Sequence, residues 1–392
     1  MAEIKFLDIE SINGPNTYNE RRIHVLNVPA LSYSDFFSKY MFTNSPCVIK
    51  NVCEEWRAFK DWASSEKINW DFFIENYGDF EAPVADCNKL DFNAQCKSNM
   101  RVKEFMEYLK LDEKEHLLYL KDWHLKAMLK KVNSPENFYK VPEYFASDWL
   151  NEYAEDKKED DFQFVYIGAK DTWTPLHADV YSSYSWSVNI FGKKKWILFP
   201  PGEEDNLRDS LRNLPILFKS EKFGCIQYFE VIQEKGDAIF VPSGWHHQVF
   251  NLQDTISINH NFINACNIDI VWMALQKNLT DVEKEIEEFK DSPDYLNQCQ
   301  IILKSLFGMD FYSFIDLIAH IAEKRLKQLQ GVNFTVFNSY QFGNKHIKFD
   351  LQTLYKIFNS IENHILFKNK FLKLSPNHLE LKKEISLVIK NS

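Results

Sequence analysis

The chain has 392 residues, of which 45% are hydrophobic and 15% aromatic, and its formal net charge is -10. This acidic balance argues against direct binding of nucleic acid, because proteins that bind it usually present a basic patch or stripe. No low-complexity stretch divides the chain, so we expect one large catalytic domain with a helical annex.

The N-terminal segment MAEIKFLDIE alternates charged and apolar residues, which is not the pattern of a signal peptide. No apolar run approaches the ~18 residues of a membrane-spanning helix. Seven cysteines are spread along the chain without a CxxC pair, which favours reduced thiols over zinc or redox chemistry. We therefore expect no membrane association, and a location in the cytoplasm or possible passage into the nucleus.

Residues 1–160 mix helical and extended patterns, and we expect them to extend the sheet of a central core. The 3.6-residue period predicts helices at residues 32–41, 54–62 and 68–78. Short β-branched or apolar runs predict strands at residues 46–52, 81–87 and from about Leu117 to Trp123.

Residues 161–264 change to a period of two with frequent turn residues, as in an antiparallel sandwich or barrel. Gly192 and Lys193 are predicted to form a tight hairpin between two strands. The polar stretch from Glu203 to Lys222 is expected to be a long surface loop. The predicted strands are residues 162–169, 185–191, 194–199, 226–231, 237–242 and 255–263.

Residues 265–392 return to the helical period, and we expect a C-terminal helical region. Its clearest apolar stripe consists of Phe311, Phe314, Ile315 and Ile318. Packing against the sandwich and a homodimer interface are both open interpretations of this stripe.

Two His-x-Asp/Glu pairs occur in the chain, and their contexts differ. His378 and Glu380 lie in a predicted helical tail with no other histidine nearby, which favours a surface position. His177 and Asp179 follow a predicted strand and the turn TWTP, and residues two apart in an extended segment point to the same side. A third ligand is available from His246 or His247, which face opposite ways, so only one of them can complete the site.

Two imidazoles and one carboxylate on one face of an octahedron hold iron(II) and leave three positions, two for a chelating oxo-acid and one for dioxygen. A histidine buried beside an aspartate, or a zinc or manganese site in a non-redox cupin-like protein, remain alternatives. Strand alternation places Lys194 on the same side as Trp196 and Leu198, where a buried ammonium would require an anionic partner. The alternative is an exposed run of three lysines at residues 193–195.

The segments TPLHADVYSSYSWSVNIFGKKKWILFPPG, GDAIFVPSGWHHQVFN and TISINHNF resemble the JmjC-domain oxygenases. LLYLKDWHL and YFASDWLNEY narrow the resemblance to a branch whose members hydroxylate a lysine of the eukaryotic translation termination factor. The resemblance implies a mainly β fold with helices, a cupin-like double-stranded β-helix or jelly roll with an N-terminal α/β extension. It also implies Fe(II), 2-oxoglutarate and O2 as cofactor and cosubstrates.

Residue by residue, the resemblance selects His247, five residues after Pro242, as the third metal ligand beside His177 and Asp179, and it leaves His246 to packing. Ser185 and Ser187 stand near a position where relatives often have asparagine, and neither receives a role. The residues that the resemblance places around 2-oxoglutarate are Tyr119, Thr174, Lys194 and Asn261.

The activity that the resemblance implies is hydroxylation of a lysine side-chain carbon in a protein, with the termination factor as the expected partner. One alternative is histone lysine demethylation, which uses the same chemistry on an N-methyl carbon but normally comes with reader modules or zinc fingers. A second alternative is a binding module that keeps the jelly roll without catalysis.

Overall fold

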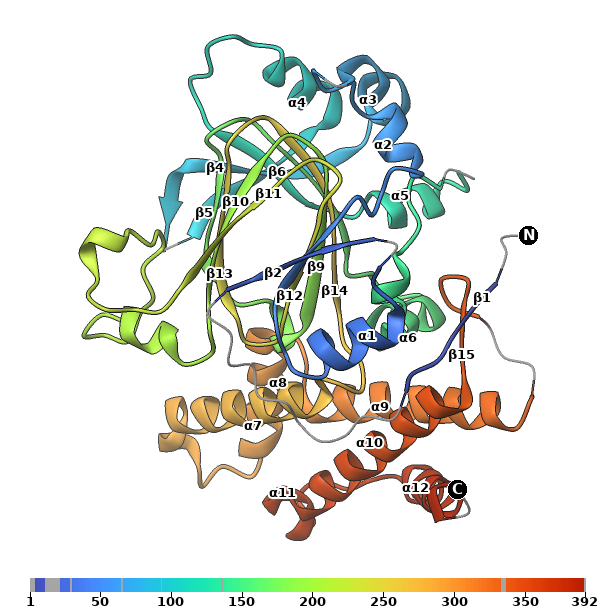
Figure 1. The fold of residues 1–392 in the computed structure, drawn as a ribbon. Coiled ribbons are helices and arrows are strands. Elements are labelled where there is room, and N and C mark those ends of the chain that lie inside the picture. The colour runs from blue at the N-terminus through green and yellow to red at the C-terminus, as the bar shows by residue number, and fades with distance from the viewer. Residues whose placement is uncertain are drawn as a thin grey trace.

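The computed structural model describes residues 4–10, 22–28, 30–64, 66–92, 94–134, 137–332 and 336–390. Two β-sheets occupy the middle of the molecule, with α2, α3 and α4 above them and the C-terminal helices below (Figure 1). Among the residues described, no helix combines the length and the apolar character that a membrane span requires.

The larger sheet has nine strands in the order β2-β3-β12-β9-β14-β7-β6-β4-β5. Its N-terminal strands lie at both edges of the sheet, and only β2 and β3 pair in parallel. The bounds are β2 His24–Asn27, β3 Cys47–Lys50, β4 Glu81–Asp91, β5 Ala94–Arg101, β6 Leu118–Trp123, β7 Gln163–Gly168, β9 Tyr184–Phe191, β12 Ala238–Val241 and β14 Thr255–Phe262.

The smaller sheet has four antiparallel strands in the order β11-β10-β13-β8 and lies against the larger one (Figure 1). Its strands are β8 Trp173–His177, β10 Lys194–Phe199, β11 Phe229–Gln233 and β13 His246–Asn251. Two antiparallel sheets whose strands alternate along the chain in this way form a jelly roll, so the predicted fold class is confirmed.

Two predictions about local structure are wrong, and one strand was missed. No hairpin forms at Gly192, because β9 belongs to the larger sheet and β10 to the smaller one, so the chain crosses between sheets there. Gly192 has a φ of 78°, and a Cβ at this position would lie 2.0 Å from the carbonyl oxygen of Asp254, so the crossing requires glycine. The predicted turn TWTP is part of strand β8, and strand β5 was missed because AQCKSNMR lacks apolar alternation.

The stretch from Glu203 to Lys222 is also more than a surface loop. It contains two 3-10 turns, Glu203–Leu207 and Ser220–Lys222. Leu207 and Phe218 are buried against Ile197 and Phe199 of β10, on the outer face of the smaller sheet. Both faces of β10 are therefore covered, one by this segment and one by the interior of the jelly roll.

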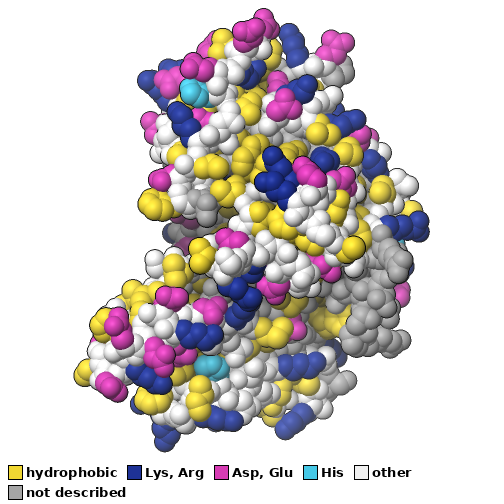
Figure 2. Space-filling view, turned by 90° about the vertical axis from the view of Figure 1, so that its left-hand side faces the viewer, with side chains coloured by type: hydrophobic (Ala, Val, Ile, Leu, Met, Phe, Trp, Pro, Cys, Tyr) yellow, Lys and Arg dark blue, Asp and Glu magenta, His cyan; other side chains and the backbone are white. Residues whose placement is uncertain are grey.

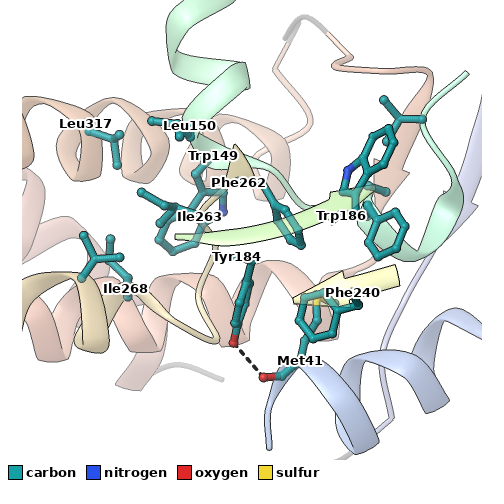
Figure 3. Packing of buried hydrophobic residues seen from close by; sticks show 14 of the residues in the cluster. Met41, Trp149, Leu150, Tyr184, Trp186, Phe240, Phe262, Ile263, Ile268 and Leu317 are labelled. Atoms are coloured by element: carbon teal, nitrogen blue, oxygen red, sulfur yellow. Dashed lines mark hydrogen bonds between the residues drawn. The ribbon is translucent and has the colours of Figure 1, made fainter. Parts of the chain in front are cut away.

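Helices of the N-terminal half cover the outer face of the larger sheet. Tyr184, Phe240 and Phe262, from three adjacent strands, converge there, and the Tyr184 hydroxyl donates to the carbonyl oxygen of Met41 at 2.7 Å (Figure 3). The helices are α1 Tyr33–Phe36, continued by a π-helix over Phe37–Met41, α2 Arg57–Asp61, α3 Trp70–Tyr77, α4 Val102–Leu109, α5 Leu125–Lys131 and α6 Trp149–Lys157.

From residue 268 onward the described elements are helices, apart from β15, Tyr340–Phe342, which pairs with β1, Lys5–Leu7. The apolar stripe of Phe311, Phe314, Ile315 and Ile318 is buried within the chain, so these residues pack internally. The helices are α7 Ile268–Glu285, α8 Tyr295–Phe307, α9 Phe311–Leu329, α10 Asn344–Asn363, α11 Ile365–Lys368 and α12 Pro376–Lys390.

A buried ion-pair network fastens this helical region to the core. The guanidinium of Arg325 in α9 donates to Glu152 of α6 at 3.0 Å and to Asp350 of α10 at 2.8 Å. Arg325 and Asp350 have fully buried side chains.

On the face of the molecule with the β4–β5 hairpin, acidic and basic side chains of the described residues are interspersed (Figure 2).

Candidate metal centre and cosubstrate pocket

The structure brings His177, Asp179 and His247 together at one end of the smaller sheet. His177 ends β8 and pairs in register with His247 of β13, and Asp179 follows β8 by two residues. One ligand atom from each of the three lies within 4.8 Å of the other two. The two imidazole centroids are 4.4 Å apart. This spacing suits a single metal ion between the three side chains.

The tautomers of both histidines fit a metal ligand. Nδ1 of His177 lies 2.8 Å from the carbonyl oxygen of Pro175, and Nδ1 of His247 lies 3.0 Å from that of Trp245. A carbonyl can only accept, so each Nδ1 donates its proton and each Nε2 keeps its lone pair for a metal. Loss of contact with water, with His247 nearby, lowers the pKa of His177 to about 4, so this imidazole is neutral at pH 7.

A hydroxyl that received no role from the sequence orients the carboxylate. Ser185 of β9 donates to Oδ2 of Asp179 at 2.6 Å, which fixes one oxygen and leaves the other for a metal. Ser187, two residues along the same strand, donates to Oδ1 of Asn259 at 3.0 Å. Strand alternation predicts that both serines of β9 face inward. It does not predict the contact between Ser185 and Asp179, because that contact depends on the path of the loop between β8 and β9.

His246 points away from this centre. Its Nδ1 lies 3.7 Å from the Glu204 carboxylate, in the segment that covers the outer face of the smaller sheet. Strand alternation therefore separates the two adjacent histidines as expected, and His247 is the one on the metal side.

Lys194 is buried in the interior with an exposed fraction of 1%. Its Nζ donates to the Ser257 hydroxyl at 2.7 Å and lies 3.4 Å from the Tyr119 hydroxyl. No described carboxylate forms an ion pair with Lys194, and burial lowers the pKa of its ammonium to about 7. A buried cation without an acidic partner is suited to an anionic ligand. Ser257 is a further contact that sequence reasoning missed.

Tyr119, Thr174 and Asn261, which the resemblance assigns to the cosubstrate, line the same cavity as the triad and Lys194. Burial raises the pKa of Tyr119 despite hydrogen bonds with Asn251 and Thr174, so its hydroxyl remains a proton donor. Nδ2 of Asn261 donates to the Ser183 hydroxyl at 3.1 Å.

The cavity has a volume of about 270 Å³, and part of its wall is formed by β5, β6 and β7. This wall contributes polar side chains that sequence reasoning did not single out. They are Lys97, Lys121, Asp122 and Tyr166.

Comparisons with known proteins agree with this geometry. A family model of the cupin-like domain matches residues 33–268. The chain is 43% identical to the 2-oxoglutarate and iron-dependent oxygenase JMJD4 of Danio rerio over 382 residues, which are 90% of this chain and 88% of that protein. It is 43% identical to the Mus musculus protein of the same name over 354 residues, 85% and 83% of the two chains.

A relative with a different printed activity is also similar. The arginine-specific demethylase JMJ20 of Arabidopsis thaliana is 40% identical over 337 residues, 79% of this chain and 72% of that protein. Family model and relatives cover most of the chain, including the triad and Lys194. The chain therefore belongs to the cupin-like JmjC family of 2-oxoglutarate and iron-dependent oxygenases.

Proposed function

We propose that this protein uses iron(II), 2-oxoglutarate and dioxygen to hydroxylate a lysine side-chain carbon of the translation termination factor. The observation that carries the oxygenase part is the presence, in one cavity, of the His177–Asp179–His247 triad and a buried Lys194 with which no carboxylate of the described residues pairs. The first fits a divalent metal and the second fits a dicarboxylate cosubstrate.

In this proposal His177, Asp179 and His247 hold iron(II) through two neutral Nε2 atoms and one carboxylate oxygen. Iron bound there would activate dioxygen, so that 2-oxoglutarate is converted to succinate and carbon dioxide and one oxygen atom enters a substrate C–H bond. Ser185 keeps the carboxylate of Asp179 in one orientation by its 2.6 Å hydrogen bond.

Lys194, Tyr119 and Thr174 orient the cosubstrate. The protonated Lys194 ammonium offers a charge-assisted hydrogen bond to the distal carboxylate, and the hydroxyls of Tyr119 and Thr174 offer neutral ones. Trp196, whose ring lies 5.6 Å from that of His247, forms an apolar part of the cavity wall.

The choice of a lysine in the termination factor rests on the sequence resemblance. Two features favour a macromolecular substrate. The net charge of -10 favours a basic segment, though only through long-range attraction. The end of the β4–β5 hairpin, whose strand β5 supplies Lys97 to the cavity wall, exposes Leu90 and Phe92, with exposed fractions of 50% and 98%. A cytoplasmic location is part of the same proposal.

Demethylation of a methylated arginine or lysine side chain is the second candidate, because an arginine-specific demethylase is 40% identical to this chain over 337 residues. Histone lysine demethylation, which the sequence left open, is a variant of the same chemistry. Oxidation of an N-methyl carbon releases formaldehyde, whereas oxidation of a side-chain carbon that is not bonded to nitrogen leaves a stable alcohol. The two candidates therefore give different products from one cavity.

The deciding experiment incubates purified protein with termination factor, iron(II) and 2-oxoglutarate, with His177→Ala as the control, and maps the peptides by mass spectrometry. A lysine that gains one oxygen atom, with succinate formed in equal amount, supports the proposal. Methyl loss with formaldehyde, on methylated histone or termination factor, would replace it by demethylation. Succinate formation no higher than in the control would favour the non-catalytic binding module.

A further inference from the structure

Strand β6 is irregular at the point where it meets the active-site cavity. Its pairing with β7 shifts between Leu120 and Trp123, so that Lys121 and Asp122 together lie opposite Tyr166. Asp122 has a φ of 60°, in the left-handed region that non-glycine residues seldom adopt. Successive residues of a regular strand face opposite sides, but here both Lys121 and Asp122 line the cavity. The bulge thus turns a carboxylate inward, as bulges near active sites often do.

The Asp122 carboxylate is held from two sides. The Tyr166 hydroxyl donates to Oδ1 at 2.7 Å, and Nζ of Lys97 on β5 lies 2.5 Å from Oδ2. Lys121 has a different partner, since its buried ammonium donates to Oε1 of Gln95 at 2.8 Å. Tyr166 therefore fixes Asp122 from inside the sheet, while Lys97 reaches it from the outer strand.

Among the described residues that line the cavity, only Asp122 and Asp179 have carboxylates. Asp179 belongs to the metal triad. A lysine substrate must place its ammonium somewhere in this cavity, and a desolvated cation without a carboxylate would oppose binding. By elimination, Asp122 is the group in the described cavity wall that can neutralise the substrate.

We propose that Asp122 is the specificity-determining residue that binds the side-chain cation of the substrate. This inference rests on the proposed function and deepens it. With the ammonium fixed at Asp122, the oxidised atom is an aliphatic carbon on the path from the ammonium to the metal triad, and the nitrogen is kept away from the metal. Asp122 thus determines which part of the side chain is presented for oxidation.

Lys97 occupies one side of Asp122, and in this proposal the substrate cation replaces it. The side chains of Lys97 and Asp122 have exposed fractions of 48% and 37%, and ion pairs this open to water contribute little to stability. Lys97 can therefore swing into solvent at small cost. Tyr166, whose pKa is raised by burial and by the charge of Asp122, stays protonated and keeps the carboxylate in place.

The test compares two peptides of about 15 residues, one centred on the lysine mapped in the termination factor and one with norleucine, which lacks the ammonium, at that position. Binding is measured by fluorescence anisotropy with the iron- and 2-oxoglutarate-loaded protein under anaerobic conditions, where no turnover occurs. We expect the wild-type protein to bind the lysine peptide about 10-fold or more tightly than the norleucine peptide. Asp122→Asn should reduce this ratio to within about 2-fold.

Asp79→Asn is the matched control, because Asp79 is an exposed acid that also pairs with a lysine, Lys103 at 3.2 Å, and does not line the cavity. It should keep the wild-type ratio. Equal binding of the two peptides by the wild-type protein would overturn the inference even if Asp122→Asn fails to fold, and so would an unchanged ratio in a folded Asp122→Asn protein. Failure of the proposed function would appear earlier, as the absence of any oxidised lysine in the mapping experiment.

Discussion

Replacement of Lys194 by methionine should have opposite effects on stability and on cosubstrate binding. Burial lowers the pKa of Lys194 from 10.5 to about 7, which corresponds to a penalty on the order of 5 kcal/mol for the charged form in the free protein. Between pH ~7 and 10.5 the unfolded chain binds more protons than the folded one. The buried ammonium therefore lowers the free energy of unfolding by its full amount below pH ~7, and this effect disappears as the pH approaches 10.5.

Methionine fills a similar volume without a charge, so Lys194→Met should raise the free energy of unfolding at pH 6.5 and raise it less at pH 9. The same change removes the cation that faces the cosubstrate, and loss of one partner of a buried charged pair costs about 2–5 kcal/mol. The KM for 2-oxoglutarate should then rise at least ~30-fold. Urea unfolding at both pH values, and succinate formation against 2-oxoglutarate concentration, measure the two effects.

Lys195→Met is the control, since Lys195 lies on the opposite face of β10 with a 33% exposed side chain and a Glu230 partner at 3.4 Å. Its unfolding free energy should change by less than ~0.5 kcal/mol. Two results would refute the assignment of Lys194 as a buried cation that binds the cosubstrate carboxylate. One is a Lys194→Met protein that is less stable than wild type at pH 6.5, and the other is an unchanged KM for 2-oxoglutarate.

Four further predictions follow from the same contacts. The wild-type KM for 2-oxoglutarate should rise by up to ~10-fold for each pH unit above pH 7, because only protonated Lys194 binds the carboxylate. This rise should be absent from Lys194→Met, and pH profiles of succinate formation measure it. Ser185→Ala should weaken iron(II) binding ~10- to 100-fold in metal titrations, and unchanged affinity would mean that its bond to Asp179 has no orienting role. Arg325→Met should destabilise the fold by ~3–5 kcal/mol in urea, because Asp350 loses its guanidinium partner and Glu152 keeps only Lys324, and a neutral effect would contradict that account. Gly192→Ala should destabilise it by at least ~2 kcal/mol, whereas Gly224→Ala, with open space around its Cβ position, should not.

The jelly roll was predictable because its strands have a clear period of two and the triad lies in segments with a recognisable order. Alternation along single strands was enough to place Lys194 inside and to put His246 and His247 on opposite faces. Such local rules do not tell which strands pair. The segment around Gly192 therefore looked like a hairpin, although its two strands belong to different sheets.

The contacts that were missed depend on tertiary structure. Ser257 meets Lys194 across the space between the two sheets, and Ser185 meets Asp179 across the turn between β8 and β9, and the sequence does not specify either approach. Asp122 was hidden for another reason, because strict alternation predicts that Asp122 and Lys121 face opposite sides and only the bulge in β6 places both in the cavity. Strand β5, which supplies Lys97, is too polar to have a strand pattern.

The most direct test of the central claim is the number of iron(II) ions bound per chain under anaerobic conditions with 2-oxoglutarate present. Wild type and His246→Ala should each bind one, and His177→Ala, Asp179→Ala and His247→Ala should bind none at the same iron concentration. Iron retained by His247→Ala and lost by His246→Ala would contradict the proposed triad.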